Sequence, residues 1–121
     1  MKTFKTSKKR SPKFPVIRFD PNGNLSISGT SIDIKPEVNF NPLINWIGTY
    51  KGDSLHIEID LGMANCRSVK MLYQAIVTAD LNSNIKKKYI NWFYRNVEQQ
   101  ELGARISNVL TSSKFQLTFK E

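Results

Sequence analysis

Residues 54–75 read SLHIEIDLGMANCRSVKMLYQA, a strand pattern that passes directly into a helix pattern. Over residues 54–62 apolar and polar side chains alternate, which is the period of a strand with one buried face. From Cys66 to Asn82 the apolar side chains return at helical spacing, and Asn65 is a typical N-cap. The stretch therefore predicts an αβ unit, around which the rest of the chain is arranged. The expected inward stripe of its helix is Val69, Leu72, Tyr73, Ile76 and Ala79.

The segments on both sides extend this unit. Upstream, PNGN at 21–24 predicts a hairpin turn between two short strands, because Asn and Gly tolerate a positive φ. A helix is predicted over residues 42–52, with Pro42 in its first turn and Gly52 at its exit. Downstream, KKKYINWFY at 86–94 is rich in aromatic and β-branched residues and predicts a strand buried on both faces. The last two elements are a helix over 98–110, with Leu102, Ile106 and Val109 inward, and a strand over 114–120, with Phe115, Leu117 and Phe119 on one face.

The predicted order is β-β-α-β-α-β-α-β, in one α/β domain over residues 14–121. Because a helix separates each later pair of strands, we expect right-handed crossovers and a mostly parallel sheet after the N-terminal hairpin. Residues 1–13 carry six basic residues and no acid. We expect these residues to form a flexible basic tail.

Composition and charge exclude several classes of protein. The chain has 121 residues, of which 40% are hydrophobic and 23% charged, as in ordinary globular domains. No apolar run approaches the ~20 residues that span a membrane. The formal net charge is +8, but residues 14–121 carry only 12 basic against 10 acidic residues. The single cysteine, Cys66, cannot form an internal disulfide, so a reducing, cytoplasmic setting is expected.

Few residues could carry catalysis. His56 is the only histidine, and it lies in the middle of a strand, opposite the apolar face. Neither the glycine-rich phosphate-binding motifs nor the HExxH zinc motif occurs, and one cysteine with one histidine does not make a metal site. We therefore expect a protein that is not an enzyme and that needs no cofactor or metal.

The strand-to-helix junction is the strongest candidate for function. In α/β domains ligands bind at the C-terminal ends of strands, and the first turn of a helix offers unpaired N–H groups and a partial positive charge. A phosphate or a cysteine thiolate would be stabilised there, with Arg67 and Lys70 nearby. The alternative is that Asn65 only caps the helix and that Cys66 is an ordinary first-turn residue.

The order and spacing of several short motifs resemble one known family, the SiaC-type regulatory phosphoproteins. The resemblance runs from about Val16 to the C-terminus. It implies a bacterial protein with a fold similar to SpoIIAA and other STAS domains, which agrees with the predicted order of elements. The motifs are ISGTSI (27–32), PLINWIGTY (42–50), IEIDLGMANCRSVKMLYQ (57–74), INWFY (90–94) and ELG (101–103).

This resemblance implies a role as a partner switch. In that family a SiaB-like kinase phosphorylates the protein, and a SiaA-like phosphatase of the PP2C type reverses the reaction. The unmodified form binds and activates a SiaD-like diguanylate cyclase, which links it to cyclic-di-GMP and biofilm control. A phosphate at an exposed helix start adds a charge of about −2, which abolishes docking without changing the fold.

The first departure from the family pattern removes the residue that is phosphorylated. The family has Asn-Thr-Ser-Ser where this chain has Asn65, Cys66, Arg67 and Ser68, so Cys66 replaces the phosphoacceptor. Ser68 is an alternative phosphoacceptor, although two residues along a helix place it on another face. The resemblance implies an interaction surface formed by these four residues and Lys70.

The second departure is in charge. After the INWFY strand, four positions where the family tends to have acidic residues have lost the acid, so the surface becomes neutral to positive. Electrostatic complementarity controls partner choice, and a partner suited to an acidic surface is not expected to suit this one. The four positions are Arg95, Asn96, Ala104 and Arg105, whereas Glu98 and Glu101 remain acidic.

Three functions follow from these observations. The first is a SiaC-like interaction protein whose phosphoswitch is lost or altered. The second is a thiol sensor on the same scaffold, with Cys66 as the reactive residue. The third is nucleic-acid binding through residues 1–13 and Lys86–Lys88. Against the third, the aromatic side chains that could stack on bases are expected in the core; they are Tyr89, Trp92, Phe93 and Tyr94.

Overall fold

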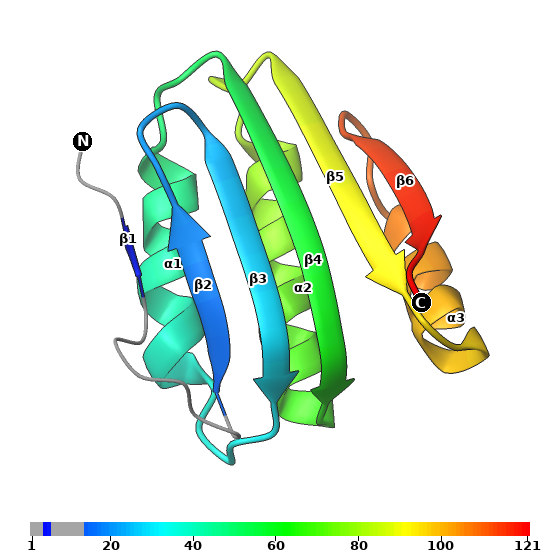
Figure 1. The fold of residues 1–121 in the computed structure, drawn as a ribbon. Coiled ribbons are helices and arrows are strands. Elements are labelled where there is room, and N and C mark those ends of the chain that lie inside the picture. Colours follow the sequence, from blue (N-terminus) through cyan, green and yellow to red (C-terminus); the bar gives the residue numbers. More distant parts are fainter. Residues whose placement is uncertain (1–3, 6–13) are drawn as a thin grey trace.

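The structure is a computed structural model, and it describes residues 4–5 and 14–121 (Figure 1). The strands are β1 (Phe4–Lys5), β2 (Pro15–Phe19), β3 (Asn24–Ser31), β4 (Ser54–Ala64), β5 (Lys87–Tyr94) and β6 (Lys114–Phe119). The helices are α1 (Glu37–Thr49), α2 (Cys66–Leu81) and α3 (Val97–Ser107). Apart from β1, this is the predicted order of elements.

The strands form one six-stranded sheet in the order β1-β2-β3-β4-β5-β6. β2 pairs antiparallel with β1 and β3, whereas β3 to β6 are parallel to one another. The three helices lie behind the sheet and cover one of its faces (Figure 1). We call the other side the open face. The prediction of an N-terminal hairpin followed by a mostly parallel sheet is confirmed.

Helix α1 begins earlier than predicted. It starts at Glu37, so Pro42 lies inside the helix and not in its first turn. The physical reason is the core, because Phe40, Leu43 and Ile47 share one helix face and are all fully buried. The sequence prediction begins this helix at Pro42 because proline suits a first helical turn.

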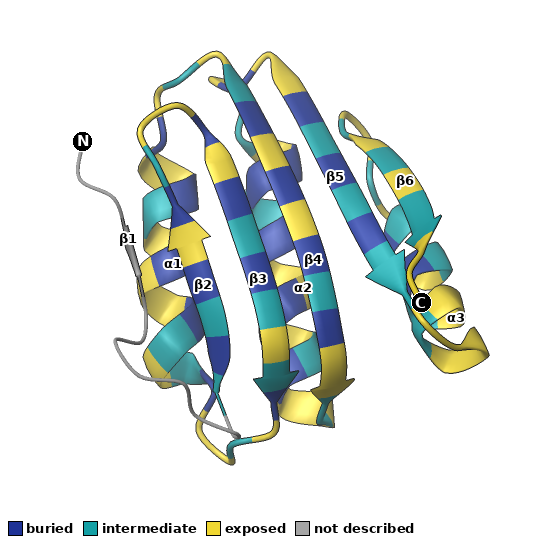
Figure 2. Cartoon of the chain, in the orientation of Figure 1, coloured by how far each residue is buried: buried dark blue, intermediate teal, exposed yellow. Residues whose placement is uncertain are grey.

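Strand β5 is buried on one face only, contrary to prediction. Ile90 and Trp92 point to the helices and are buried, whereas Tyr89, Asn91 and Phe93 are half-buried on the open face. Figure 2 shows this alternation along β4 and β5. The prediction failed because aromatic residues stand on both faces of the strand, while the helices cover only one face. Two further side chains predicted to point inward are exposed: Tyr73 and Val109.

The N-terminal segment is not wholly an unpaired tail. Phe4 is in register with Phe19, and Lys5 with Arg18, so this short strand extends the sheet beyond β2. The predicted tail is therefore wrong at Phe4 and Lys5. The rest of it, residues 1–3 and 6–13, lies outside the described residues.

Two glycines are required by close approaches. Gly23, in the predicted hairpin turn, has φ = +90°, and a Cβ there would lie 2.3 Å from the Ser54 carbonyl oxygen. Gly103 in α3 faces the sheet, where a Cβ would come within 2.7 Å of Trp92 and Leu117. The indole N–H of Trp92 donates to the carbonyl of Gln99 (2.9 Å), which fixes α3 against β5.

A buried carboxylate joins the end of α2 to the loop before β6. Asp80, 4% exposed, accepts hydrogen bonds from the backbone N–H groups of Thr111, Ser112 and Ser113, each at 2.9 Å. Burial raises the pKa of Asp80, but the hydrogen bonds outweigh this effect and hold the pKa well below its ordinary value. Asp80 therefore stabilises the fold only while it is ionised.

We expect Asp80→Asn to lower the free energy of unfolding at pH 7 by about 2–4 kcal/mol, because an amide cannot accept all of these bonds. The folded-state pKa lies below the unfolded value of about 3.9, so the contribution of Asp80 is complete above that pH and is lost as the pH falls below it. Urea unfolding at a series of pH values measures both effects. The exposed Asp53→Asn is the matched control, and equal losses in the two variants would contradict this role.

Candidate functional site

Three parallel strands end at one edge of the sheet, and two helices begin there. β3 ends at Ser31, and β4 ends at Ala64, two residues before the start of α2. β5 ends at Tyr94, and α3 begins at Val97. The N-termini of α2 and α3 therefore lie at the C-terminal edge of the parallel strands, where α/β domains commonly bind their ligands.

Asn65 fixes the start of α2, as predicted. Its Oδ1 accepts a hydrogen bond from the N–H of Ser68 (2.8 Å), which is the N-cap interaction. Its Nδ2 donates to the carbonyl of Asp33 (3.0 Å), and its backbone N–H donates to the carbonyl of Ser31 (3.0 Å). One residue thus caps α2 and holds the loop after β3 against it.

Cys66 and Arg67 follow this cap and differ in their contacts. Cys66 is a free thiol and is exposed at the first position of α2. Nη1 of Arg67 donates to the carbonyl of Ile34 (2.7 Å), which gives a second tie between α2 and the loop after β3. Lys70 is exposed one turn further along the helix. A thiol-sensing role for Cys66 stays a prediction.

Ser68 does not belong to the surface. It is 0% exposed, and its hydroxyl accepts a hydrogen bond from the hydroxyl of Ser31 (2.6 Å), which is also buried. Its inclusion in the predicted interaction surface is therefore wrong. The helical period explains this burial. Two residues along a helix turn a side chain to roughly the opposite side, so Ser68 faces the sheet when Cys66 is exposed. In this structure a kinase has no access to Ser68.

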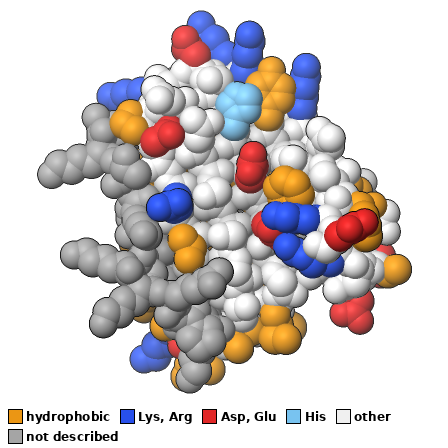
Figure 3. Space-filling view, in the orientation of Figure 1, with side chains coloured by type: hydrophobic (Ala, Val, Ile, Leu, Met, Phe, Trp, Pro, Cys, Tyr) orange, Lys and Arg blue, Asp and Glu red, His pale blue; other side chains and the backbone are white. Residues whose placement is uncertain are grey.

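Exposed large apolar side chains gather around the same edge. Nine such side chains are exposed in the described chain, and five of them lie near the N-termini of the helices. Figure 3 shows apolar side chains along this lower end of the molecule. Clustered exposed apolar groups are typical of a protein-binding surface. These five residues form the edge patch: Ile32 (37% exposed), Ile34 (73%), Val38 (68%), Met63 (62%) and Val97 (65%).

Sequence reasoning missed the edge patch. Ile32 and Ile34 stand in a connection, and Met63 lies at the end of a strand, where exposure depends on tertiary structure. The only signal in the sequence was the SIDIK segment at 31–35, which places two isoleucines in an otherwise polar connection.

A shallow groove between α2 and α3 adjoins Cys66. Cys66, Lys70 and Tyr73 follow one another at helical spacing, so Cys66 stands at the N-terminal end of the helix face that forms one wall. Lys70 and Arg105 give the groove positive charge next to apolar side chains. The residues of this helix groove are Val69, Lys70, Tyr73, Gln74, Leu102, Arg105 and Ile106.

The four positions where the resemblance implies acidic residues lie on or next to α3. Asn96 caps α3, accepting from the N–H of Gln99 (2.9 Å), and Arg105 lies in its last turn. Arg95 binds the carboxylate of Asp60 on the open face, as does Lys120 (2.7 Å). The Arg95 hydrogen bond is the main reason that the pKa of Asp60 is lowered. Arg95 is thus neutralised, whereas Arg105 remains exposed at the helix groove.

The remaining candidates do not join this site. His56 lies on the open face, where its ring stacks on Tyr89 with centroids 4.8 Å apart. Among the described residues, no group of three or more His, Cys, Asp or Glu side chains could hold a metal ion. Within the same residues no helix is both long and apolar enough to cross a membrane.

Comparison with known proteins identifies the family. The sequence pattern of the SiaC family regulatory phosphoproteins matches residues 7–120. The chain belongs to the SiaC family. This confirms the resemblance seen in the sequence and extends it upstream of Val16. Among curated proteins, none matches the chain.

Solved structures of SiaC proteins share the fold. Apo-SiaC from Pseudomonas aeruginosa superposes with a TM-score of 0.83 at 20% identity, covering 98% of this chain and 99% of that one. A second structure of SiaC from Pseudomonas aeruginosa gives a TM-score of 0.81 at 19% identity, covering 99% and 100%. A third contains the diguanylate cyclase SiaD in complex with its activator SiaC from the same organism (TM-score 0.78, 21% identity, 92% and 96% covered).

Proposed function

We propose that this protein regulates a diguanylate cyclase by binding to it, and that the edge patch and the helix groove form the docking surface. The observation that carries the proposal is the gathering of exposed apolar side chains at the edge of the sheet where α2 begins with Cys66. A family member, SiaC of Pseudomonas aeruginosa, is the activator of the diguanylate cyclase SiaD. The proposed role is therefore bacterial cyclic-di-GMP signalling and biofilm control, in the cytoplasm.

The docking surface suits regulation without catalysis. Apolar side chains such as Ile34 and Met63 lose water when a partner covers them, which favours association. Lys70 and Arg105 at the helix groove favour a partner that is acidic at the matching position. Two ties, made by Asn65 and Arg67, hold the loop that carries Ile34 in place, so little ordering is required on binding.

The switch of the family is proposed to be lost at this position. A kinase that phosphorylates hydroxyl groups would not use the thiol of Cys66, and Ser68 is buried. Of the three family partners, the SiaB-like kinase and the SiaA-like phosphatase would therefore have no substrate at this junction. The protein would remain in the form that binds the cyclase.

Binding to the cyclase is expected to depend on charge at position 66. Cys66→Thr should bind a diguanylate cyclase of the same organism as tightly as the wild type, whereas Cys66→Asp should bind at least about tenfold more weakly, because it places a charge beside apolar contacts. Calorimetry gives the Kd, and the rate of cyclic-di-GMP synthesis reports activation.

The control is Ser83→Asp, which adds the same charge at an exposed position just beyond the other end of α2. Equal affinity of the Cys66→Asp and Ser83→Asp variants would show that this junction is not the interface. Absence of binding by the wild type would reject a diguanylate cyclase as the partner.

Phosphorylation is expected to require a hydroxyl at position 66. With a SiaB-like kinase and ATP, the wild type should remain unmodified and Cys66→Thr should gain one phosphate, because only the variant exposes a hydroxyl there. Intact-mass and peptide mass spectrometry measure both outcomes. Phosphate on Ser68 of the folded wild type would contradict the loss of the switch and would show that it has shifted.

A further inference from the structure

The open face carries an aromatic pair that the proposed docking surface does not use. His56 of β4 is in register with Tyr89 of β5, and the two rings stack with centroids 4.8 Å apart and planes inclined by 20°. Lys114 of β6 is in register with Tyr89, and its ammonium lies 5.7 Å from the centre of that ring. Three neighbouring strands thus present two stacked rings and a cation in one row.

Shallow depressions adjoin this pair on both sides. The one toward β6 is lined by Tyr89 and Asn91, among others, and the one toward β2 by Arg18. His56 and Glu58 line both depressions and therefore connect them. The result is a polar path across the sheet with aromatic rings at its centre.

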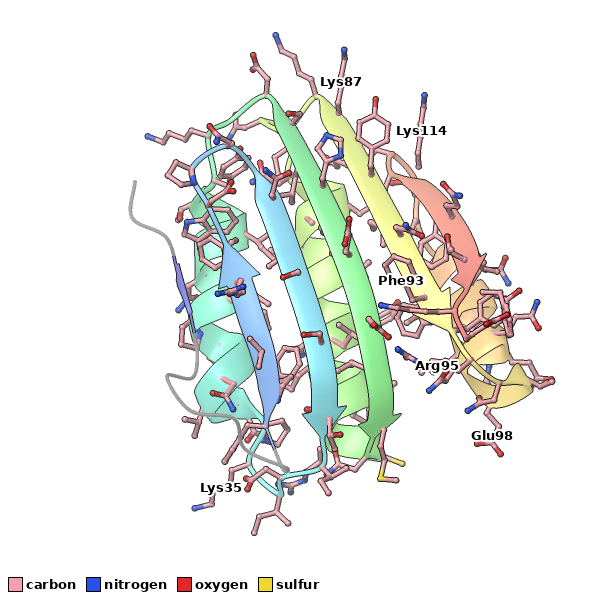
Figure 4. The ribbon with its side chains drawn as sticks, viewed as in Figure 1. Lys35, Lys87, Phe93, Arg95, Glu98 and Lys114 are labelled. Carbon is pink, nitrogen blue, oxygen red and sulfur yellow. The ribbon has the colours of Figure 1, made fainter. Side chains whose placement is uncertain are left out.

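Most of the acidic charge at the lower end of the open face is already compensated. Asp60 binds both Arg95 and Lys120. The ammonium of Lys120 also lies 5.0 Å from the ring centre of Phe93. Figure 4 shows Phe93 and Arg95 together at this end of β5. This cluster covers Phe93. The ring of Tyr89 lies between His56 and the ammonium of Lys114, so the ring that remains available for stacking is that of His56, on its side toward the depression near β2.

Three other cations of the open face are not compensated in the same way. Within the described part of the chain, Arg18, Lys87 and Lys114 take part in no ion pair. Figure 4 shows Lys87 and Lys114 extending from the same end of the sheet. At the opposite side of the sheet, Lys5 of β1 is in register with Arg18.

The geometry points to a single strand of nucleic acid as the ligand of the open face. Bases stack on exposed aromatic rings in a way that tolerates any sequence, and phosphates follow the cations. Open sheets with surface aromatic residues bind single-stranded RNA in this manner. The carboxylate of Glu58, between the two depressions, accepts hydrogen bonds as the exocyclic amino groups of bases require. The expectation that Tyr89 lies in the core, which counted against nucleic acid, is removed by the structure.

The observations favour nucleic acid over a protein at this surface. The core of a protein interface is more apolar than the rest of a protein's surface, and the exposed apolar side chains gather at the edge patch instead. The row of His56, Tyr89 and Lys114 also lies near the start of β4 to β6, at the opposite end of the strands from Cys66. The two surfaces are therefore separate, and a nucleic acid on one leaves the other accessible.

Fluorescence anisotropy of the full-length chain with a labelled single-stranded RNA of about 12 nucleotides tests the proposal. His56→Ala should weaken binding at least about tenfold, because it removes the stacking ring, and His56→Phe should keep the wild-type affinity. Tyr73→Ala, which removes an exposed tyrosine from α2, is the matched control. Lys114→Glu should weaken binding and reduce its salt dependence, whereas Lys35→Glu, at the other end of the sheet, should do neither.

Two results would overturn the proposal. Equal affinity of wild type and His56→Ala would show that any RNA binding is electrostatic attraction elsewhere, such as at the basic N-terminus. Weaker cyclase binding by His56→Ala, without any RNA binding, would make the open face a protein surface. Cys66→Asp is expected to leave RNA affinity unchanged, so failure of this proposal and failure of cyclase regulation are distinguishable.

Discussion

All three helices pack against the same face of the sheet, and the rest of the structure follows from this constraint. Each central strand alternates between a buried apolar row and an outward row, as Leu55, Ile57 and Ile59 do opposite His56 and Glu58. The helices bury one row in the core, and the open face is left to polar and aromatic side chains. Burial of the apolar row is the main source of stability, whereas the outward row is free to carry function.

At the C-terminal edge of the strands, the same packing brings loop and helix ends together. Asn65 and Arg67 bind the loop after β3 through the carbonyls of Asp33 and Ile34. These bonds satisfy polar backbone groups while the neighbouring apolar side chains stay exposed. Cys66, which the resemblance places at the phosphorylated position of the family, therefore lies at the same edge as exposed apolar side chains such as Ile34 and Met63. Under the proposed function, added charge at this position weakens docking. In the function proposed above, the thiol of Cys66 leaves this surface in the form that binds the partner.

Local patterns in the sequence were enough to predict the order of elements and the junction. The alternation from Leu55 to Leu61 gave β4, and Asn65 marked the start of α2. The predictions that failed concerned which side chains are buried, and this depends on tertiary packing. Tyr89 and Trp92 stand on opposite faces of an aromatic strand, and only the helix positions decide which is buried. Likewise, the burial of Ser68 and the exposure of Ile34 depend on how α2 and the loop after β3 pack together. The spacing of apolar residues along the sequence does not specify this packing.

The most direct test of the account is hydrogen exchange of the protein alone and bound to the diguanylate cyclase. Amides at a docking surface exchange more slowly in a complex because the partner excludes water and restricts opening. Slower exchange in the loop after β3, at the start of α2 and along α3 is the predicted result, with β5 and β6 unchanged. Slower exchange confined to β5 and β6 would place the partner on the open face and contradict docking around Cys66.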